Sequence, residues 1–369
     1  MKHFRRLPFV WALLLAGAAG AQTPSPGAKS IGMGGTFVAA GSDAASLWGN
    51  PAGIAQCTLG CAVLFGGAIA TDENRFANTL HDDFANADLT HLSAGQLTRL
   101  EDELTSFQTP GTGTIGSGSA GLAYAIQGFG IGIGGTVYTG VYPTIDLIGI
   151  AGSMVPSLDS RVTLRGLETR ELRTGYSKSF SGITVGGDLR YIQGRTYSVS
   201  ETLTQAAESP VNLSRDALKK NEVKTSRVAF DLGALYQPVP KLRLGIVGLN
   251  LNEPKFATFD GPDAVLPRTI RVGAAFAPLS WDGVVISADA DLNKQKTLIP
   301  GLSSRRIAAG AQIYFLRVGA YRDLEAVDTH WAYTGGFQLS GHFLSLGVAG
   351  VYSTGKRDLG ASAEVKIKL

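Results

Sequence analysis

The sequence LGASAEVKIKL, residues 359–369, ends the chain with a strict alternation of two kinds of side chain. Every second residue from Leu359 to Leu369 is apolar, while the residues between them are small or charged and include Glu364, Lys366 and Lys368. Successive side chains of a β-strand point to opposite faces, so this stretch predicts a strand with one apolar and one polar face. Such a strand suits a wall between lipid and water.

Thirteen earlier runs show the same kind of pattern. We predict strands over residues 60–70, 115–127, 130–142, 160–180, 183–200, 224–237, 241–251, 268–277, 282–292, 305–314, 316–323, 329–340, 342–353 and 358–369. Most runs reach the ~9–11 residues that a tilted strand needs to cross a membrane, and the number of strands is even, as in bacterial outer-membrane barrels. The sequence therefore predicts an all-β fold, a transmembrane antiparallel β-barrel of about 14 strands.

Long and short connections alternate between these runs. The short ones include residues 128–129, 181–182 and 238–240, and the long ones include 71–114, 143–159 and 201–223. Outer-membrane barrels have tight turns on the periplasmic side and longer loops outside. We therefore expect the N- and C-termini on the periplasmic side of a bacterial outer membrane, in contact with its lipid, and insertion by the barrel-assembly machinery.

The first 21 residues have the features of a secretory signal peptide. Lys2, Arg5 and Arg6 precede an apolar run over residues 7–19, and small residues before Gln22 fit a cleavage site. The 33 basic residues of the chain, less these three, equal its 30 acidic ones. A chain without net charge or a basic cluster gives no electrostatic support for a nucleic-acid partner.

Glycine makes up 48 of 369 residues, or 13%, which is roughly twice the usual frequency of about 7%. Two matches to the dinucleotide-binding pattern, starting at Gly116 and Gly130, lie inside alternating runs and not between a strand and a helix. We interpret these strand glycines as places where the backbone bends or is closely approached.

No constellation for catalysis, metal or cofactor binding stands out. A disulfide between Cys57 and Cys61 is favoured over free thiols in an exported protein, although it requires a turn between the two residues. His81 and His91 lie in the first long loop with Asp82 and Asp83, and we interpret them as polar residues exposed to solvent more readily than as a cation site. We predict no enzyme activity, no metal and no cofactor.

Charged residues on the predicted inner faces form a second candidate feature. The residues expected to line the lumen are Asp188, Arg190, Arg243, Arg271, Asp289, Asp291, Glu364, Lys366 and Lys368. They predict either a network of mutually neutralised charges, which we favour, or a selectivity lining.

The longest loop, within an insertion at about residues 72–110, contains a helix signal. Ser93 and Gln96 form a capping box, and Leu97, Leu100, Leu104 and Phe107 share one helical face before Pro110. A helix packed on the barrel rim is favoured over a moving lid. A second short helix is expected around residues 214–220.

Between leader and barrel, residues 22–58 are too few and too rich in glycine to fold alone. The stretches GAKSIGMGGTFV (27–38) and DAASLWGNPAGIA (43–55) favour packing within a cavity built by the barrel of residues 59–369, with a short helix over 43–48 and a turn at Asn50-Pro51. We expect this segment to act as a hatch. Its candidate gating residues are Gly32, Met33, Gly34, Gly35, Asp43, Trp48, Asn50, Pro51, Ala52 and Gly53.

These two stretches resemble the N-terminal segment of the FadL-like superfamily of outer-membrane proteins. The stretches RGLETRELRTGYSKSF (165–180), residues 189–197, LGALY (232–236) and GLNL (248–251) are most similar to its TraF-like branch, and PorV-type barrels are relatives. The resemblance covers nearly the whole mature chain. It implies a 14-stranded barrel with an N-terminal hatch, and of the transporters' functional residues only residues 50–53 match.

Three functions follow as hypotheses. The first is a passive channel for a hydrophobic or amphiphilic small molecule, gated by the hatch. The second is a sealed structural barrel, associated with secretion or conjugation, whose loops dock another protein; a lipid hydrolase is a third and weaker alternative. A continuous apolar cavity reaching Asn50-Pro51 would favour transport, and a lumen filled by charged side chains would favour sealing.

Overall fold

The computed structural model describes residues 27–79, 95, 102–150, 153–156, 160–202, 221–281 and 283–368. The predicted signal peptide, the Ser93–Gln96 capping box with Leu97 and Leu100, and the helix expected over 214–220 lie outside these residues. Among the described residues, no helix has the length and apolarity to cross a bilayer.

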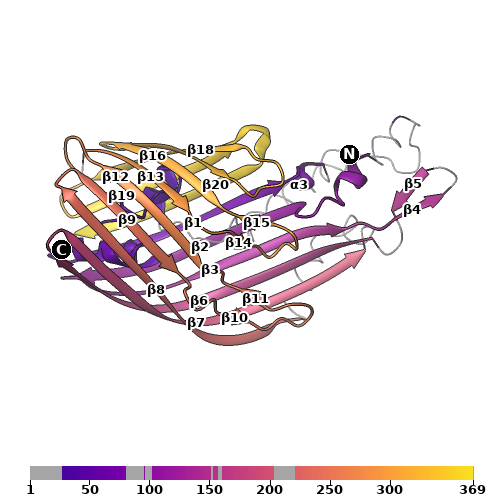
Figure 1. Cartoon of the computed structure of the whole chain (residues 1–369), viewed down its shortest axis with the longest axis horizontal. Coiled ribbons are helices and arrows are strands. Elements are labelled where there is room, and N and C mark those ends of the chain that lie inside the picture. The colour runs from indigo at the N-terminus through magenta and orange to yellow at the C-terminus, as the bar shows by residue number, and fades with distance from the viewer. Residues whose placement is uncertain are drawn as a thin grey trace, which may run out of the picture.

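Fourteen antiparallel strands form one closed barrel, and the predicted fold class and strand number are confirmed (Figure 1). The first and last strands close it, with Phe65 opposite Glu364. The strands are β1 (Cys61–Glu73), β2 (Gly113–Ile126), β3 (Phe129–Thr144), β6 (Arg161–Phe180), β7 (Ile183–Thr202), β8 (Val223–Val239), β9 (Leu242–Leu249), β12 (Thr269–Phe276), β13 (Val284–Asp291), β16 (Arg306–Ile313), β17 (Leu316–Asp323), β18 (Trp331–Ser340), β19 (Leu344–Ser353) and β20 (Asp358–Lys368).

The apolar and polar residues that alternate in the sequence face the outside and the inside of the barrel wall. Along β19, Leu344, Leu346 and Val348 are exposed on the outside, whereas the residues between them are buried inside. Large apolar side chains are exposed in this way all around the barrel. An outer surface this apolar is stable only against lipid, which defines the barrel as a transmembrane one.

Tight turns join the strands at one end. Gln127 and Gly128 connect β2 to β3, and Ser181 and Gly182 connect β6 to β7; all four have positive φ angles, as two-residue hairpins of type I′ require. The first turn lies one residue earlier than predicted. At the opposite end most connections are longer, although the one between β19 and β20 has only the four residues 354–357.

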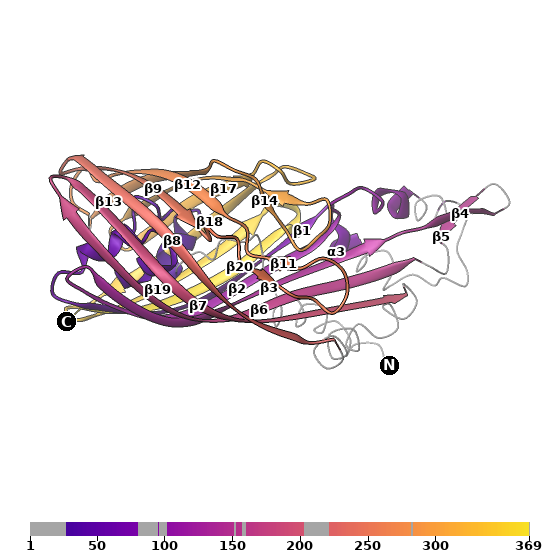
Figure 2. The ribbon, with the colours of Figure 1, turned by 60° about the horizontal axis from the view of Figure 1, so that its bottom comes forward.

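The wall is taller on one side than on the other (Figure 2). Strands β6 and β7 have 20 residues each, whereas β9, β12 and β13 have eight. Three short ribbons that we did not predict lie in the long connections. They are β4 (Leu147–Ile150) with β5 (Ser153–Pro156), β10 (Lys255–Phe256) with β11 (Ala264–Val265), and β14 (Gln295–Lys296) with β15 (Ser303–Ser304).

The described part of the first long loop is helical at α3 (Phe76–Thr79) and over residues 102–106. Phe76, Leu104 and Phe107 pack together against Val162 and Tyr197 on the tall strands. Phe76 and Phe107 meet edge to face, with their ring centres 5.1 Å apart. These contacts place the described helical residues against the barrel rim.

Candidate functional site: the inner segment and its seat

Residues 27–56, here called the inner segment, lie within the barrel at its tight-turn end (Figure 2). The segment contains α2 (Gly27–Gly32) and two 3₁₀ helices, η1 (Ala44–Trp48) and η2 (Pro51–Gln56). Asp43 caps η1 by accepting from Ala45 N at 3.1 Å, and Asn50 caps η2 by accepting from Ala52 N at 3.1 Å. The Asp and Asn residues of the motif therefore shape the segment locally, as N-caps do.

Glycines of the wall make room for Trp48. A Cβ built on Gly132 would lie 2.5 Å from the indole, and one on Gly134 would lie 2.9 Å from it. The Trp48 side chain is 1% exposed and meets Phe65 edge to face at 5.2 Å. Strand glycines thus admit an aromatic ring against the bare backbone of β3, which is the close approach that the sequence predicts.

The same device recurs around the barrel. Side chains at Gly310 and Gly319 would collide with the backbone of Met33 and Gly34, and one at Gly186 would lie 2.6 Å from Ala52 N. We call the part of the wall that contacts the inner segment its seat. The seat fits the backbone of the segment closely, because any side chain at these glycine positions would displace the segment.

Wall side chains bind the first half of the segment through its backbone N–H groups. The Asp289 carboxylate accepts from Phe37 N at 2.8 Å and from Val38 N at 3.0 Å. Thr334 Oγ1 accepts from Gly34 N at 2.9 Å and donates to Gly32 O at 3.1 Å. Hydrogen bonds to a carboxylate are among the stronger ones in a buried site.

An ionic cluster holds the start of the segment. Lys29 N donates to Glu364 at 2.9 Å, and Lys366 binds both Asp43 and Glu364. Arg317 Nη1 lies 3.4 Å from Glu364 on its other side. Strand β20 thus supplies Glu364 and Lys366 to the seat.

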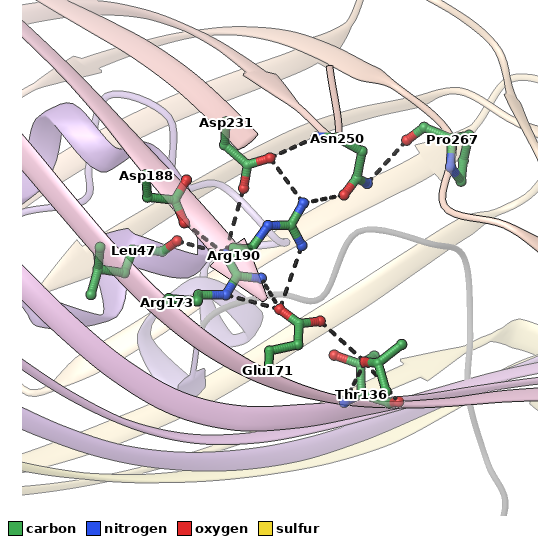
Figure 3. A network of polar contacts seen from close by, with 10 residues as sticks. Leu47, Thr136, Glu171, Arg173, Asp188, Arg190, Asp231, Asn250 and Pro267 are labelled. Carbon is green, nitrogen blue, oxygen red and sulfur yellow. Dashed lines mark hydrogen bonds and ion pairs between the residues drawn. The ribbon is translucent and has the colours of Figure 1, made fainter. Parts of the chain in front are cut away.

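A second ionic network lies under η1, and we call it the arginine belt (Figure 3). Arg173 lies 2.8 Å from Glu171 and 3.5 Å from both Asp188 and Asp231, and Arg190 lies 3.0 Å from Asp231. The belt consists of Glu171, Arg173, Asp188, Arg190, Asp231 and Asn250. Arg173 Nη1 also donates to Leu47 O at 2.8 Å, which ties the belt to the inner segment.

The predicted lumen residues mostly meet inside. Seven of them are buried and Lys366 is partly so, whereas Lys368 is exposed at the end of β20 and joins none of the networks described here. Arg271 pairs with Asp291 at 2.5 Å, and Arg243 donates to Gln56 at 3.2 Å while its guanidinium lies 3.9 Å from the centre of the Trp281 ring. Sequence reasoning missed Glu171, Arg173, Asp231 and Arg317, although the alternation of their strands places them inward.

The junction between segment and wall is covalently stapled. A disulfide joins Cys57, which follows η2, to Cys61, the first residue of β1, with Cα atoms 5.8 Å apart. Gly60 lies in the intervening turn with φ of 109°. The disulfide fixes the turn over residues 57–61, so release of the inner segment would leave this turn in place beside β1.

Three small cavities lie between the described residues of the inner segment, the wall and the loops. Cavities among the inner segment, the wall and the loops have volumes of about 10–20 Å³, room for single water molecules. One is apolar and lies beneath the long loops between Ile115, Tyr138, Leu167, Leu266 and Leu298. Among the described residues, no three His, Cys, Asp or Glu side chains come together as a metal site would require.

A closed 14-stranded barrel with an apolar outside and its own N-terminal segment inside defines an outer-membrane β-barrel with an internal plug. Within this class, the family model described as "F plasmid transfer operon, TraF, protein" matches residues 65–291, so the chain belongs to that family. The comparison with curated proteins gives no match.

Several solved structures have a similar fold. The toluene transporter TbuX of Ralstonia pickettii is 13% identical with a TM-score of 0.56, over 93% of this chain and 98% of its own. The monoaromatic hydrocarbon channel CymD is 14% identical with a TM-score of 0.58, over 95% and 99%. A Pseudomonas aeruginosa FadL homologue is 11% identical with a TM-score of 0.51, over 95% and 100%. At these identities the likeness is one of fold.

Proposed function

We propose that the protein is a passive outer-membrane channel for hydrophobic or amphiphilic small molecules, with the inner segment as its gate and the tight turns in the periplasm. The observation that carries this proposal is the seat. The segment is held by separable hydrogen bonds and ion pairs against bare glycine backbone, and no strand of it joins the barrel sheet. Structural neighbours described as a toluene transporter and a hydrocarbon channel support the substrate class.

In this proposal a ligand enters beneath the long loops. The cavity between Tyr138, Leu167 and Leu298 has room only for a water molecule, so it must widen before a ligand enters. Its apolar walls then offer the first contacts, because apolar surface binds apolar ligands without the cost of desolvating polar groups. The arginine belt and η1 block the way beyond it. The structure corresponds to the closed state, and opening requires Leu47 and Trp48 to leave Arg173 and Gly132.

A disulfide lock tests the proposal. Thr36 Oγ1 and Ser287 Oγ lie 2.6 Å apart, so the double variant Thr36→Cys/Ser287→Cys can cross-link the inner segment to β13. In liposomes, we expect the oxidised variant to lose uptake of a hydrophobic fluorescent probe and to regain it on reduction. The wild type with and without reductant controls for Cys57–Cys61, and each single variant controls for the substitutions.

The second candidate function is a sealed barrel that docks another protein. It is favoured by the charged lumen and the small cavities, which meet the condition stated above for sealing. A sealed barrel predicts that the lock changes nothing, and that deletion of residues 27–55 leaves probe permeability unchanged. Either result would reject the gated channel.

A further inference from the structure

The outer wall has an open hollow of about 590 Å³ on β1, β2, β3, β6 and β7. One side is a cross-strand row of outward apolar side chains, in which each residue is paired in register with the next. The row is Leu64, Leu122, Ile133, Leu172 and Tyr191. Its members are about half exposed, for example Ile133 at 57%.

Small residues make the hollow. The next row toward the long loops contains Gly66, Ala120 and Gly135 in register, so no large side chain stands beside the apolar row on these three strands. On the tall strands the same row continues as Arg170 and Gln193. The hollow is therefore apolar along its length and polar at one end.

At the polar end of the hollow, the outer face changes sharply from apolar to charged residues. Arg170 has a side chain 70% exposed, and its contact with Glu168 at 3.4 Å is a weak surface pair. Beyond it lie Arg195 and Lys224, both paired with Glu222. The outward face thus changes within one row from apolar to charged, as expected where acyl chains end and headgroups begin.

We infer that this hollow binds an outer-leaflet glycolipid, with an acyl chain along the apolar row and a phosphate at the Arg170 guanidinium. Arginine is suited to phosphate because its planar donors bind two oxygens together. Placement in the outer leaflet rests on the proposed orientation, with long loops outside. The inference assigns a lipid to one place on the wall and does not depend on gating.

The test measures binding of bisphosphorylated lipid A and of its dephosphorylated form to the purified full-length protein in detergent, by native mass spectrometry. Arg170→Gln should weaken binding of the phosphorylated lipid about fivefold, and Ala120→Phe, which fills the hollow, should weaken both forms. Arg268→Gln and Ala288→Phe are matched exposed controls elsewhere on the barrel. Heat-modifiable electrophoretic mobility verifies that each variant folds.

Three results would overturn the inference. The first is equal binding of the two forms of lipid A. The second is that Arg170→Gln and Ala120→Phe bind lipid A as well as their control variants do. The third is tighter binding of phosphatidylglycerol than of lipid A. Arg170→Gln should retain uptake that the Thr36–Ser287 lock abolishes, so failure of the lipid site and failure of the proposed channel are distinguishable.

Discussion

Charged side chains of the wall bind the two halves of the inner segment in opposite senses. The first half, residues 27–40, donates backbone N–H groups to acceptors on the short strands and β20, such as Asp289 and Thr334. The second half, residues 44–56, offers a backbone carbonyl at Leu47 to Arg173 on the tall strands and buries Trp48 in a glycine seat. The wall's carboxylates accept hydrogen bonds from the first half and its arginines donate them to the second, so removal of one charge should release one half at a time.

Removal of Arg173 should have the largest effect. Arg173→Met leaves Glu171, Asp188 and Asp231 without one of their two cations, and breaking a buried ionic network in this way costs about 3–5 kcal/mol of unfolding free energy. Hydrogen exchange should rise in residues 44–56 and stay unchanged in 27–40. The variant Asp289→Asn should show the reverse pattern, and equal exchange in both halves would contradict the division.

Filling the Trp48 seat should come second. Gly132→Val places side-chain atoms where the indole lies, and overpacking of a fixed site costs about 1–3 kcal/mol. Trp fluorescence should shift as Trp48 leaves its site, and probe leakage in liposomes should rise. Gly335→Val is the control, since its Cβ would have no neighbour closer than 4.0 Å.

A more local effect is expected at Thr334 on β18. Thr334→Val keeps the shape of the side chain but removes the acceptor for Gly34 N and the donor to Gly32 O. The loss should be about 1–3 kcal/mol in denaturant unfolding, because buried partners are left unsatisfied. Exchange should rise at Gly34 alone, and an increase centred on residues 44–56 would count against local anchoring.

The smallest effect concerns pH. The His330 imidazole lies in the loop before β18 and donates a hydrogen bond to the Asp358 carboxylate, which raises the pKa of His330. Because the pKa is raised in the folded state, the His330–Asp358 pair stabilises the fold fully below the unfolded pKa of about 6.5. This stabilisation is lost as the pH rises through the folded pKa. His330→Gln should therefore lower the melting temperature at pH 5.5 and leave it unchanged at pH 9. A constant difference across this range would reject the linkage.

The fold could be predicted because its cause is local. Alternation between Leu359 and Leu369, or along β19, is decided by each strand's own contact with lipid and water. The short ribbons were missed because two paired residues on each side leave no periodic signal.

The site could be predicted only in part. Asp289 and Glu364 were identified by their inward position, and Asp43, Trp48 and Asn50 by the motif that contains them. Their partners could not be identified, because Glu364 meets Lys29 only across the closing seam and Arg173 meets Leu47 only once the barrel encloses it. Lys368 shows the limit of the pattern, since it has the inward position but lies at the rim.

The closing seam has a consequence for biogenesis. Glu364 and Lys366 belong to the last strand, and they reach Lys29 and Asp43 only after β20 has paired with β1. The docking site for the inner segment is therefore complete only when the barrel has closed. A group that binds only the closed barrel stabilises it relative to an open sheet. The inner segment therefore also favours closure of the barrel.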